Sequence, residues 1–418
     1  MIEPGRRDTA GSMAGDTDGA HPVQLAPAGG RRGIVDEFNG WLSMLVERNG
    51  SDLHLKVGTP PKIRESGALL PLEREHLSHD EMEAIGAAIV PPERVGRFEA
   101  AGEIDFAYSL PGVGRFRVNV FRQRGSVSAV ARTLRFGGPS FDEMGLPEVI
   151  RRLADEPRGL VLVTGPTGSG KTTTLAAMIE HLNHTRQSHI VTIEDPIEVL
   201  FRDEVASINQ REVGSDTESF LSALRAALRQ DPDVILIGEM RDEETVRTAL
   251  AAAETGHLVL STLHTLDATE TINRIVDFFP PHLQQQARVM LASTLRGAVS
   301  QRLVPRVDGN GRVAVCEVMV VTGRVQDLIL NPQETGRVTE VIAEGEYYGM
   351  QTFDQALLKH VAAGNIAEEV AFEVASSPHD FKLMLSAQGQ RASGIEQVAG
   401  TPEDDAESTA DPLQFVKH

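Results

Sequence analysis

The sequence reads Gly165-Pro166-Thr167-Gly168-Ser169-Gly170-Lys171-Thr172 shortly after the apolar run Gly159-Leu160-Val161-Leu162-Val163. The aliphatic run is typical of a buried strand, and the stretch that begins at Lys171 favours a helix. Glycines allow a tight loop between this strand and this helix, because they carry no Cβ. The stretch therefore predicts a strand, a phosphate-binding loop and a helix. A glycine-rich turn of an ordinary α/β unit is the alternative interpretation.

This loop predicts a site for a nucleoside triphosphate, with ATP and Mg²⁺ as the expected ligands. Successive backbone N–H groups of such a loop point at phosphate oxygens, and the helix that follows adds the positive end of its dipole. We expect Lys171 to reach the β- and γ-phosphates and the Thr172 hydroxyl to bind Mg²⁺. The predicted nucleotide-binding residues are Gly165, Pro166, Thr167, Gly168, Ser169, Gly170, Lys171, Thr172 and Thr173.

Composition limits the classes of protein to which the chain can belong. Its 418 residues predict about two domains, and 60 acidic against 40 basic residues give a formal net charge of −20. An acidic chain is poorly suited to grip a nucleic-acid backbone, so we expect no nucleic-acid partner. The single cysteine, Cys316, excludes a four-cysteine zinc module. With no long apolar run and no signal-peptide core, we expect a cytoplasmic protein without an integral membrane segment.

Four regions follow from the pattern along the chain. Residues 1–30 and 386–418 lack apolar periodicity and are predicted to be disordered, the latter with an acidic cluster at 403–407. Residues 31–140 are predicted to form a small α+β domain. Residues 141–385 alternate apolar strands with helices, two of which are expected at 218–228 and 243–253. This alternation predicts an α/β domain with a parallel sheet.

The elements of the first domain follow from two periodicities. An amphipathic helix is expected around Phe38, Trp41 and Leu42, because these apolar residues recur at helical spacing. Strands are expected at residues 52–57 and 115–121, where apolar and polar residues alternate, and residues 127–131 should pair with the second strand as a hairpin.

Two acidic residues stand at the ends of predicted strands in the second domain, where open α/β sheets place their ligands. Glu194 ends the apolar run 190–193, and Glu239 follows the run 234–237. A carboxylate beside a phosphate loop can hold Mg²⁺ or orient a water molecule. We expect Glu239 to orient the attacking water, and Glu194 to assist at the water or the metal. Metal contacts, partly through water, are thus predicted for Thr172, Glu194 and Glu239. For each acid, an ordinary acidic turn or surface position is the alternative.

Two histidines flank a third apolar strand, at His257 and His264. His264 is a candidate for sensing the γ-phosphate, and His257 is a weaker candidate. The alternative is a satisfied histidine at a strand end. The two cannot share a metal ion, because they lie at opposite ends of one strand.

Three arginines, Arg117, Arg132 and Arg302, are candidates for neutralising the charge of a transferring phosphoryl group, often from a neighbouring subunit. The alternative for each is a solvated surface arginine.

The motifs together resemble those of the secretion ATPase superfamily, whose members serve type II secretion and type IV pili. Residues 165–172 resemble its Walker A motif and 192–198 its Asp box. Residues 233–242 resemble its Walker B motif and 256–265 its His box. The resemblance implies a PAS-like N-terminal domain, a RecA-like C-terminal domain, a ring of six chains and ATP bound between the two domains.

Within the superfamily, the chain resembles the twitching-motility retraction ATPases of the PilT family. The similarity covers roughly residues 34–365 and includes the stretches 51–55, 61–64, 114–121 and 348–357. Extension and secretion ATPases usually carry a four-cysteine zinc module, which this chain lacks. One departure stands out: retraction ATPases have Ala-Ile-Arg-Asn-Leu-Ile where residues 324–329 read Arg-Val-Gln-Asp-Leu-Ile, so that Gln326 replaces the arginine.

The resemblance implies an ATP-hydrolysing hexameric motor for pilus retraction, with Arg117 and Arg132 reaching the nucleotide and Arg302 matching less securely. Its implied partner is an inner-membrane platform protein, which would place the motor at the inner face of the cytoplasmic membrane. The alternatives are an extension or type II secretion ATPase, a RecA-like nucleic-acid translocase and a ring-shaped platform without ATPase activity.

Overall fold

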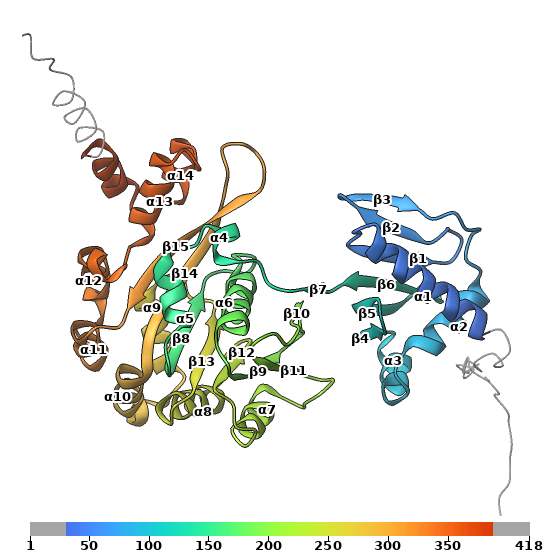
Figure 1. Cartoon of the computed structure of the whole chain (residues 1–418), viewed down its shortest axis with the longest axis horizontal. Coiled ribbons are helices and arrows are strands. Elements are labelled where there is room, and N and C mark those ends of the chain that lie inside the picture. The colour runs from blue at the N-terminus through green and yellow to red at the C-terminus, as the bar shows by residue number, and fades with distance from the viewer. Residues whose placement is uncertain (1–30, 388–418) are drawn as a thin grey trace, which may run out of the picture. The chain divides into compact units, whose positions relative to one another are not determined.

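The computed structural model describes residues 31–387. The chain divides into two compact units between Leu134 and Arg135 (Figure 1). The sequence placed this boundary after residue 140. The short strand β7 (Arg135–Phe136) pairs with β10 (Val199–Leu200), so it belongs to the second unit. The boundary therefore lies earlier in the sequence than predicted.

From residue 31 onward, the first unit is a six-stranded antiparallel sheet with three α-helices. Its strand order is β3-β2-β1-β6-β5-β4. The strands are β1 (Asp52–Lys56), β2 (Lys62–Glu65), β3 (Ala68–Pro71), β4 (Glu103–Leu110), β5 (Gly114–Gln123) and β6 (Ser126–Thr133). The helices are α1 (Arg31–Glu47), α2 (His79–Ile89) and α3 (Val95–Ala101). The predicted hairpin is confirmed: β5 pairs with β6, and Arg117 lies opposite Arg132.

Helix α1 forms because its apolar residues recur on one side, as the sequence predicted. Phe38, Trp41 and Leu42 are buried in the core of this unit. They meet alternate residues of the strands, such as Phe116 and Val118 of β5. The intervening residues of β5, among them Arg117, point to the other face of the sheet because strand side chains alternate.

The second unit is built on a seven-stranded sheet in the order β11-β9-β12-β13-β8-β14-β15. All neighbours are parallel except β14 and β15. These strands are β8 (Gly159–Thr164), β9 (His189–Glu194), β11 (Ser207–Glu212), β12 (Val234–Ile237), β13 (Leu258–Leu263), β14 (Leu295–Pro305) and β15 (Arg312–Val320). The mixed α/β fold with a parallel core is as predicted.

Helices cover this sheet on both sides. The described α-helices of the second unit are α4 (Phe141–Met144), α5 (Glu148–Ala154), α6 (Lys171–Thr185), α7 (Phe220–Ala227), α8 (Glu243–Glu254), α9 (Ala268–Asp277), α10 (Gln284–Thr294), α11 (Gly323–Leu330), α12 (Val338–Glu344), α13 (Phe353–Ala362), α14 (Glu368–Val374) and a last helix at residues 378–387. The sequence predicted helices at 218–228 and 243–253, which correspond to α7 and α8.

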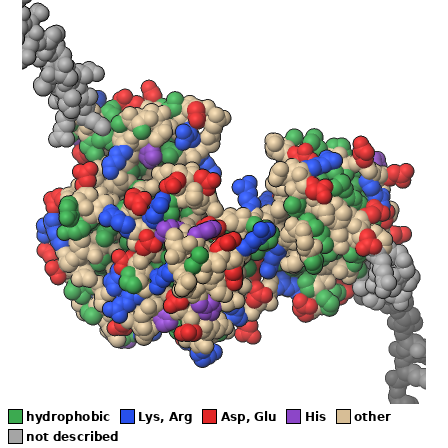
Figure 2. Space-filling model, viewed as in Figure 1, with side chains coloured by type: hydrophobic (Ala, Val, Ile, Leu, Met, Phe, Trp, Pro, Cys, Tyr) green, Lys and Arg blue, Asp and Glu red, His purple; other side chains and the backbone are tan. Residues whose placement is uncertain are grey.

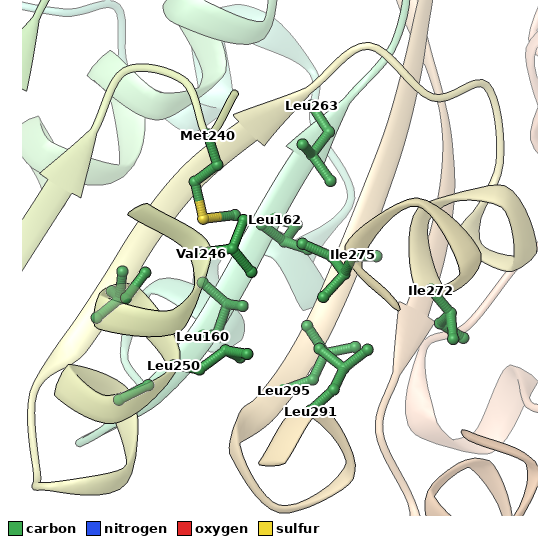
Figure 3. Close-up of a cluster of buried hydrophobic side chains, with 14 of the residues drawn as sticks. Leu160, Leu162, Met240, Val246, Leu250, Leu263, Ile272, Ile275, Leu291 and Leu295 are labelled. Carbon is green, nitrogen blue, oxygen red and sulfur yellow. The ribbon is translucent and has the colours of Figure 1, made fainter. Parts of the chain in front are cut away.

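Strand β8 is buried on both faces, which explains its uninterrupted aliphatic sequence. Leu160 and Leu162 pack into a cluster with residues of α8, α9 and α10, such as Leu250, Ile275 and Leu291 (Figure 3). The alternate residues of β8, Val161 and Val163, pack on the opposite face against α5 and α6. The strand that leads into the glycine-rich loop therefore lies at the centre of the core.

The predicted tails lie almost entirely outside the described residues. A helix that starts at Pro378 continues to Ala387, so the first residues of the tail predicted from 386 are helical. This helix begins where the Ser377 hydroxyl accepts a hydrogen bond from Asp380 N.

Acidic and basic side chains are interspersed on the face seen in Figure 2. Among the described residues, none of the helices has the length and hydropathy needed to cross a membrane.

Candidate nucleotide-binding site

The glycine-rich loop connects β8 to α6, as the sequence predicted. Gly165, Gly168 and Gly170 all have positive φ angles, of 138°, 78° and 89°. Two of these glycines also touch the neighbouring strand β14: a Cβ at Gly165 would lie 2.3 Å from Gln301 O, and one at Gly170 would lie 2.7 Å from Gln301 Nε2. Backbone angle and close approach both exclude a side chain here.

Lys171 begins α6 and folds back over the loop. Its Nζ donates hydrogen bonds to Gly165 O at 2.8 Å and to Pro166 O at 3.1 Å. Burial lowers the pKa of Lys171, and the nearby Glu239 carboxylate opposes that shift. The ammonium group is therefore held at the loop by weak neutral acceptors, which phosphate oxygens can replace with stronger, charge-assisted bonds.

A cavity of about 450 Å³ opens beside the loop, inside the second unit. Of the predicted nucleotide-binding residues, the structure places Thr167, Gly168, Gly170, Lys171, Thr172 and Thr173 in its wall. Gly165, Pro166 and Ser169 do not line the cavity. The first two supply carbonyls to Lys171, and Ser169 is buried. A volume of this size suits a small-molecule ligand.

Glu194 is the last residue of β9 and lines the same cavity. Its Oε1 accepts hydrogen bonds from Thr192 Oγ1 at 2.6 Å and from Gln210 Nε2 at 3.2 Å. Burial raises the pKa of this carboxyl above its ordinary value, and the hydrogen bonds oppose the shift. A carboxylate in this state is a stronger base than an exposed one.

Glu239 follows β12, the neighbour of β9, and lines the same cavity. Arg241 Nε donates a hydrogen bond to its Oε2 at 2.8 Å. His264, which follows β13, places Nε2 at 3.3 Å from Oε1 of the same carboxylate. The structure thus brings Lys171, Glu194, Glu239 and His264 together, because β8, β9, β12 and β13 are parallel and end at one edge of the sheet.

Arg117 and Arg132 lie on the sheet of the first unit. The Arg132 Nε donates a hydrogen bond to Asp52 Oδ1 at 2.7 Å, and Arg117 Nε lies 3.7 Å from Asp105 Oδ1. Both guanidinium groups are substantially exposed, and neither lines the cavity of the second unit. Hydrogen bonding to Arg132 and Ser51 lowers the pKa of Asp52, although burial acts in the opposite direction.

Two further candidates lie away from the cavity. His257 is at the other end of β13, where its Nδ1 lies 2.9 Å from Ala252 O at the end of α8. Arg302 stacks on Phe353, with Cζ 4.1 Å from the ring centroid, and donates to Val374 O at 3.2 Å. Gln326 lies on α11 and lines no part of the cavity.

Sequence reasoning missed several residues of the site. Arg241, Phe201, Phe220 and Arg312 line the cavity, and Asp195 lies beside Glu194 in its wall. Arg241 could have been found from the sequence, because it lies in the stretch 233–242 that also contains Glu239. Phe201 stands in a segment without a recognisable pattern and Phe220 in a predicted helix, and only the fold brings them to the loop.

Comparison with known proteins agrees with this geometry. The family model described as "Type II/IV secretion system protein" matches residues 130–372. The type IV pilus retraction ATPase PilT of Pseudomonas aeruginosa is 46% identical over 340 residues, covering 81% of this chain and 98% of the relative. A twitching motility protein of Neisseria gonorrhoeae is 45% identical over 311 residues, covering 74% of this chain and 83% of the relative.

The likeness extends to three dimensions. A crystal structure of the pilus retraction motor PilT with bound ADP superposes with a TM-score of 0.74 at 44% identity, and the alignment covers 82% of this chain and 98% of that chain. The four motifs quoted from the sequence fall within the segment that matches the family model. This chain therefore belongs to the type II/IV secretion system protein family, and within it to the PilT-type ATPases.

Proposed function

We propose that this protein hydrolyses ATP to drive the retraction of type IV pili, and hence twitching motility. The observation that carries the proposal is that the loop lysine, Lys171, lines the same cavity as Glu194, Glu239 and His264. A loop that binds phosphate and a carboxylate that orients the attacking water are what phosphoryl transfer to water requires. The relatives named for pilus retraction supply the direction of the motor.

On binding ATP, Lys171 would leave the carbonyls of Gly165 and Pro166 for the β- and γ-phosphates. Loop N–H groups and the start of α6 would bind the remaining phosphate oxygens. Glu239 would orient the attacking water, and its carboxylate must then exchange at least one of its contacts with Arg241 and His264. Glu194, whose burial raises its pKa, would assist by accepting a proton.

The residues in the cavity also fit Mg²⁺, because the Thr172 hydroxyl and the carboxylates of Glu194 and Glu239 offer the oxygen ligands that this ion prefers. These three side chains would hold the ion, partly through water. When bound, Mg²⁺ would neutralise charge on the phosphates.

Arg117 and Arg132 are proposed to neutralise the transferring phosphoryl group. They are neighbours on β5 and β6, so they present two guanidinium groups together. Arg132 is oriented by Asp52, whereas Arg117 is only loosely paired with Asp105. Guanidinium groups bind phosphoryl oxygens in a bidentate manner, which favours this role.

The working assembly is proposed to be a ring of six chains that docks on an inner-membrane pilus platform protein. The motor would then act in the cytoplasm at the inner face of the membrane, without contacts to nucleic acid. Closure on ATP and reopening after hydrolysis would supply the mechanical stroke. An extension or type II secretion ATPase is the alternative.

A count of surface pili tests the direction of the motor. Cells that lack this gene should be hyperpiliated and unable to twitch, and the wild-type gene but not Glu239→Gln should restore both properties. Bald cells would reverse the assignment and indicate an assembly motor. The purified protein should hydrolyse ATP, and ATP hydrolysis that depends on added DNA would favour a translocase instead.

A further inference from the structure

Gln301 is a buried polar residue of β14 that contacts the glycine-rich loop. It is 1% exposed and lies between Ser300 and Arg302 in the strand. Its Nε2 donates a hydrogen bond to Ser169 O, within the loop, at 2.7 Å. Its Oε1 accepts a hydrogen bond from Thr174 Oγ1, in the first turn of α6, at 2.7 Å. One amide group therefore joins β14, the loop and α6.

The orientation of this amide is fixed by its partners. Thr174 is completely buried, and the thiol of Cys316 lies 3.8 Å from the same Oε1 as a second, weak donor. Because the carbonyl of Ser169 can only accept a hydrogen bond, Nε2 must face it, and Oε1 then accepts from Thr174 and Cys316. All three side chains are buried, so loss of the amide would leave polar groups without partners.

The contact sets the direction of a peptide group that faces the cavity. The carbonyl of Ser169 and the N–H of Gly170 belong to one planar trans peptide, so they point in opposite directions. Because Gln301 holds the carbonyl on the β14 side, the Gly170 N–H is directed away from Gln301. Gly170 lines the cavity, so this side is the one that a phosphate would occupy.

Gln301 also makes close van der Waals contact with the glycines of the loop. The Gln301 carbonyl oxygen occupies the space of a Cβ at Gly165, and its amide nitrogen occupies that of a Cβ at Gly170. Backbone and side chain of one residue thus contact both ends of the loop. The second contact requires glycine at a position that the phosphate-binding pattern also requires.

We propose that Gln301 is a positioning residue for nucleotide binding, which holds the Ser169–Gly170 peptide with its N–H toward the phosphates. It does not touch the nucleotide itself. The proposal rests on the proposed binding of ATP by the loop, and it assigns to β14 a part in ATP affinity that is separate from catalysis.

The test compares Gln301→Met with Gln351→Met. Gln351 is an equally suitable buried glutamine, 6% exposed, whose Nε2 donates to Cys316 O at 2.9 Å and whose Oε1 accepts from Lys359 at 2.9 Å. It makes no contact with the loop among the hydrogen bonds of the described residues. Both substitutions remove buried amide hydrogen bonds, so we expect both to lower the melting temperature of the nucleotide-free protein.

Only Gln301→Met should weaken ATP binding. The expected loss is about tenfold in Kd, the size of one or two lost hydrogen bonds. The KM for ATP should rise by a similar factor while kcat stays within about a factor of two, because a preformed loop contributes equally to ground and transition states. Gln351→Met should bind ATP like the wild type. Equal ATP affinity in the two variants would overturn the proposal.

Thr174 provides a second test if Gln301→Met does not fold. Thr174→Ser keeps the hydroxyl that orients the amide, whereas Thr174→Val removes it with little change of shape. We expect Thr174→Ser to retain wild-type ATP affinity and Thr174→Val to lose several-fold. Identical affinities for the serine and valine variants would contradict the proposal. Failure of the wild type to bind ATP would instead refute the proposed function.

Discussion

Glu239 Oε1 and His264 Nε2 lie 3.3 Å apart at the carboxyl ends of two adjacent strands, β12 and β13. The other oxygen of Glu239 is bound by Arg241 at 2.8 Å. Both oxygens of the proposed water-orienting carboxylate are thus in contact with partners. The side chains of Arg241 and His264 are 59% and 50% exposed, so neither is confined by packing. ATP binding can therefore redistribute these contacts at low cost.

Replacing Glu239 should separate ATP binding from hydrolysis. Glu239→Gln keeps the size of the side chain but removes the charge that orients the water. We expect kcat for ATP hydrolysis to fall at least about 100-fold, while the Kd for ATP changes by less than about threefold. Steady-state phosphate release and equilibrium binding of ATP measure the two effects.

Glu244→Gln is the matched control, since Glu244 is an exposed residue on α8 that lies 3.9 Å from Arg225. It should hydrolyse ATP at the wild-type rate. Wild-type turnover by Glu239→Gln would remove Glu239 from the mechanism and leave Glu194 as the acid to examine.

Lys171→Met should abolish tight ATP binding rather than turnover alone. Nζ is the charged group at the loop, and its hydrogen bonds to Gly165 O and Pro166 O are available for exchange with phosphates. A charge-assisted hydrogen bond contributes about 1.5–3 kcal/mol, so the Kd for ATP should rise about 10- to 100-fold. Titration with a fluorescent ATP analogue provides the measurement.

The exposed Lys382 serves as the control for the lost positive charge, and Lys382→Met should bind ATP normally. If Lys171→Met and Lys382→Met bound ATP equally well, the loop would not be the phosphate site.

Much of the site was predictable because its chemistry is local in the sequence. The loop residues and their lysine lie within one octapeptide, and Glu194, Glu239 and His264 each follow an aliphatic run. Parallel strands end at one edge of the sheet, so strand ends that are far apart in sequence converge there.

The contacts that could not be predicted are those between side chains remote in sequence. Gln301 and Ser169 are brought together only because β14 pairs with β8. Nothing in the local sequence of β14 identifies its neighbour in the sheet. The domain boundary depends in the same way on the pairing of β7 with β10.

Gly170→Ala tests the fit between the loop and β14. The φ angle of +89° is strained for alanine, and the added Cβ would lie 2.7 Å from Gln301 Nε2. The left-handed backbone alone should destabilise the fold by about 1–2 kcal/mol. We expect the substitution also to displace the loop, which should raise the Kd for ATP at least about tenfold. Thermal unfolding and ATP titration separate the two effects.

Gly125→Ala is the control for backbone strain alone. Its φ angle is +79°, and no atom lies within 4 Å of the added Cβ. Gly125 lies in the β5–β6 turn of the first unit. A similar loss of ATP affinity in both variants would show that general destabilisation, rather than displacement of the loop, is responsible.

Glu317 should make the stability of the protein depend on pH. It is buried on β15, where its Oε1 accepts a hydrogen bond from Ala268 N, at the start of α9, at 2.8 Å. Burial raises its pKa from 4.5 to about 7, and the Asp267 charge adds to this shift, whereas the Ala268 hydrogen bond and Arg302 oppose it. Between these two pH values the folded state binds more protons than the unfolded state, so the free energy of unfolding falls as pH rises.

The contribution of Glu317 is thus most favourable below pH 4.5 and is lost as pH rises through about 7. A shift of this size corresponds to about 3 kcal/mol. In Glu317→Gln, which does not titrate, the free energy of unfolding should depend less steeply on pH over this range. Urea unfolding of both proteins at pH values from 5 to 8 measures the difference. Parallel pH profiles would mean that Glu317 keeps the same charge throughout, and that its hydrogen bond to α9 outweighs its burial.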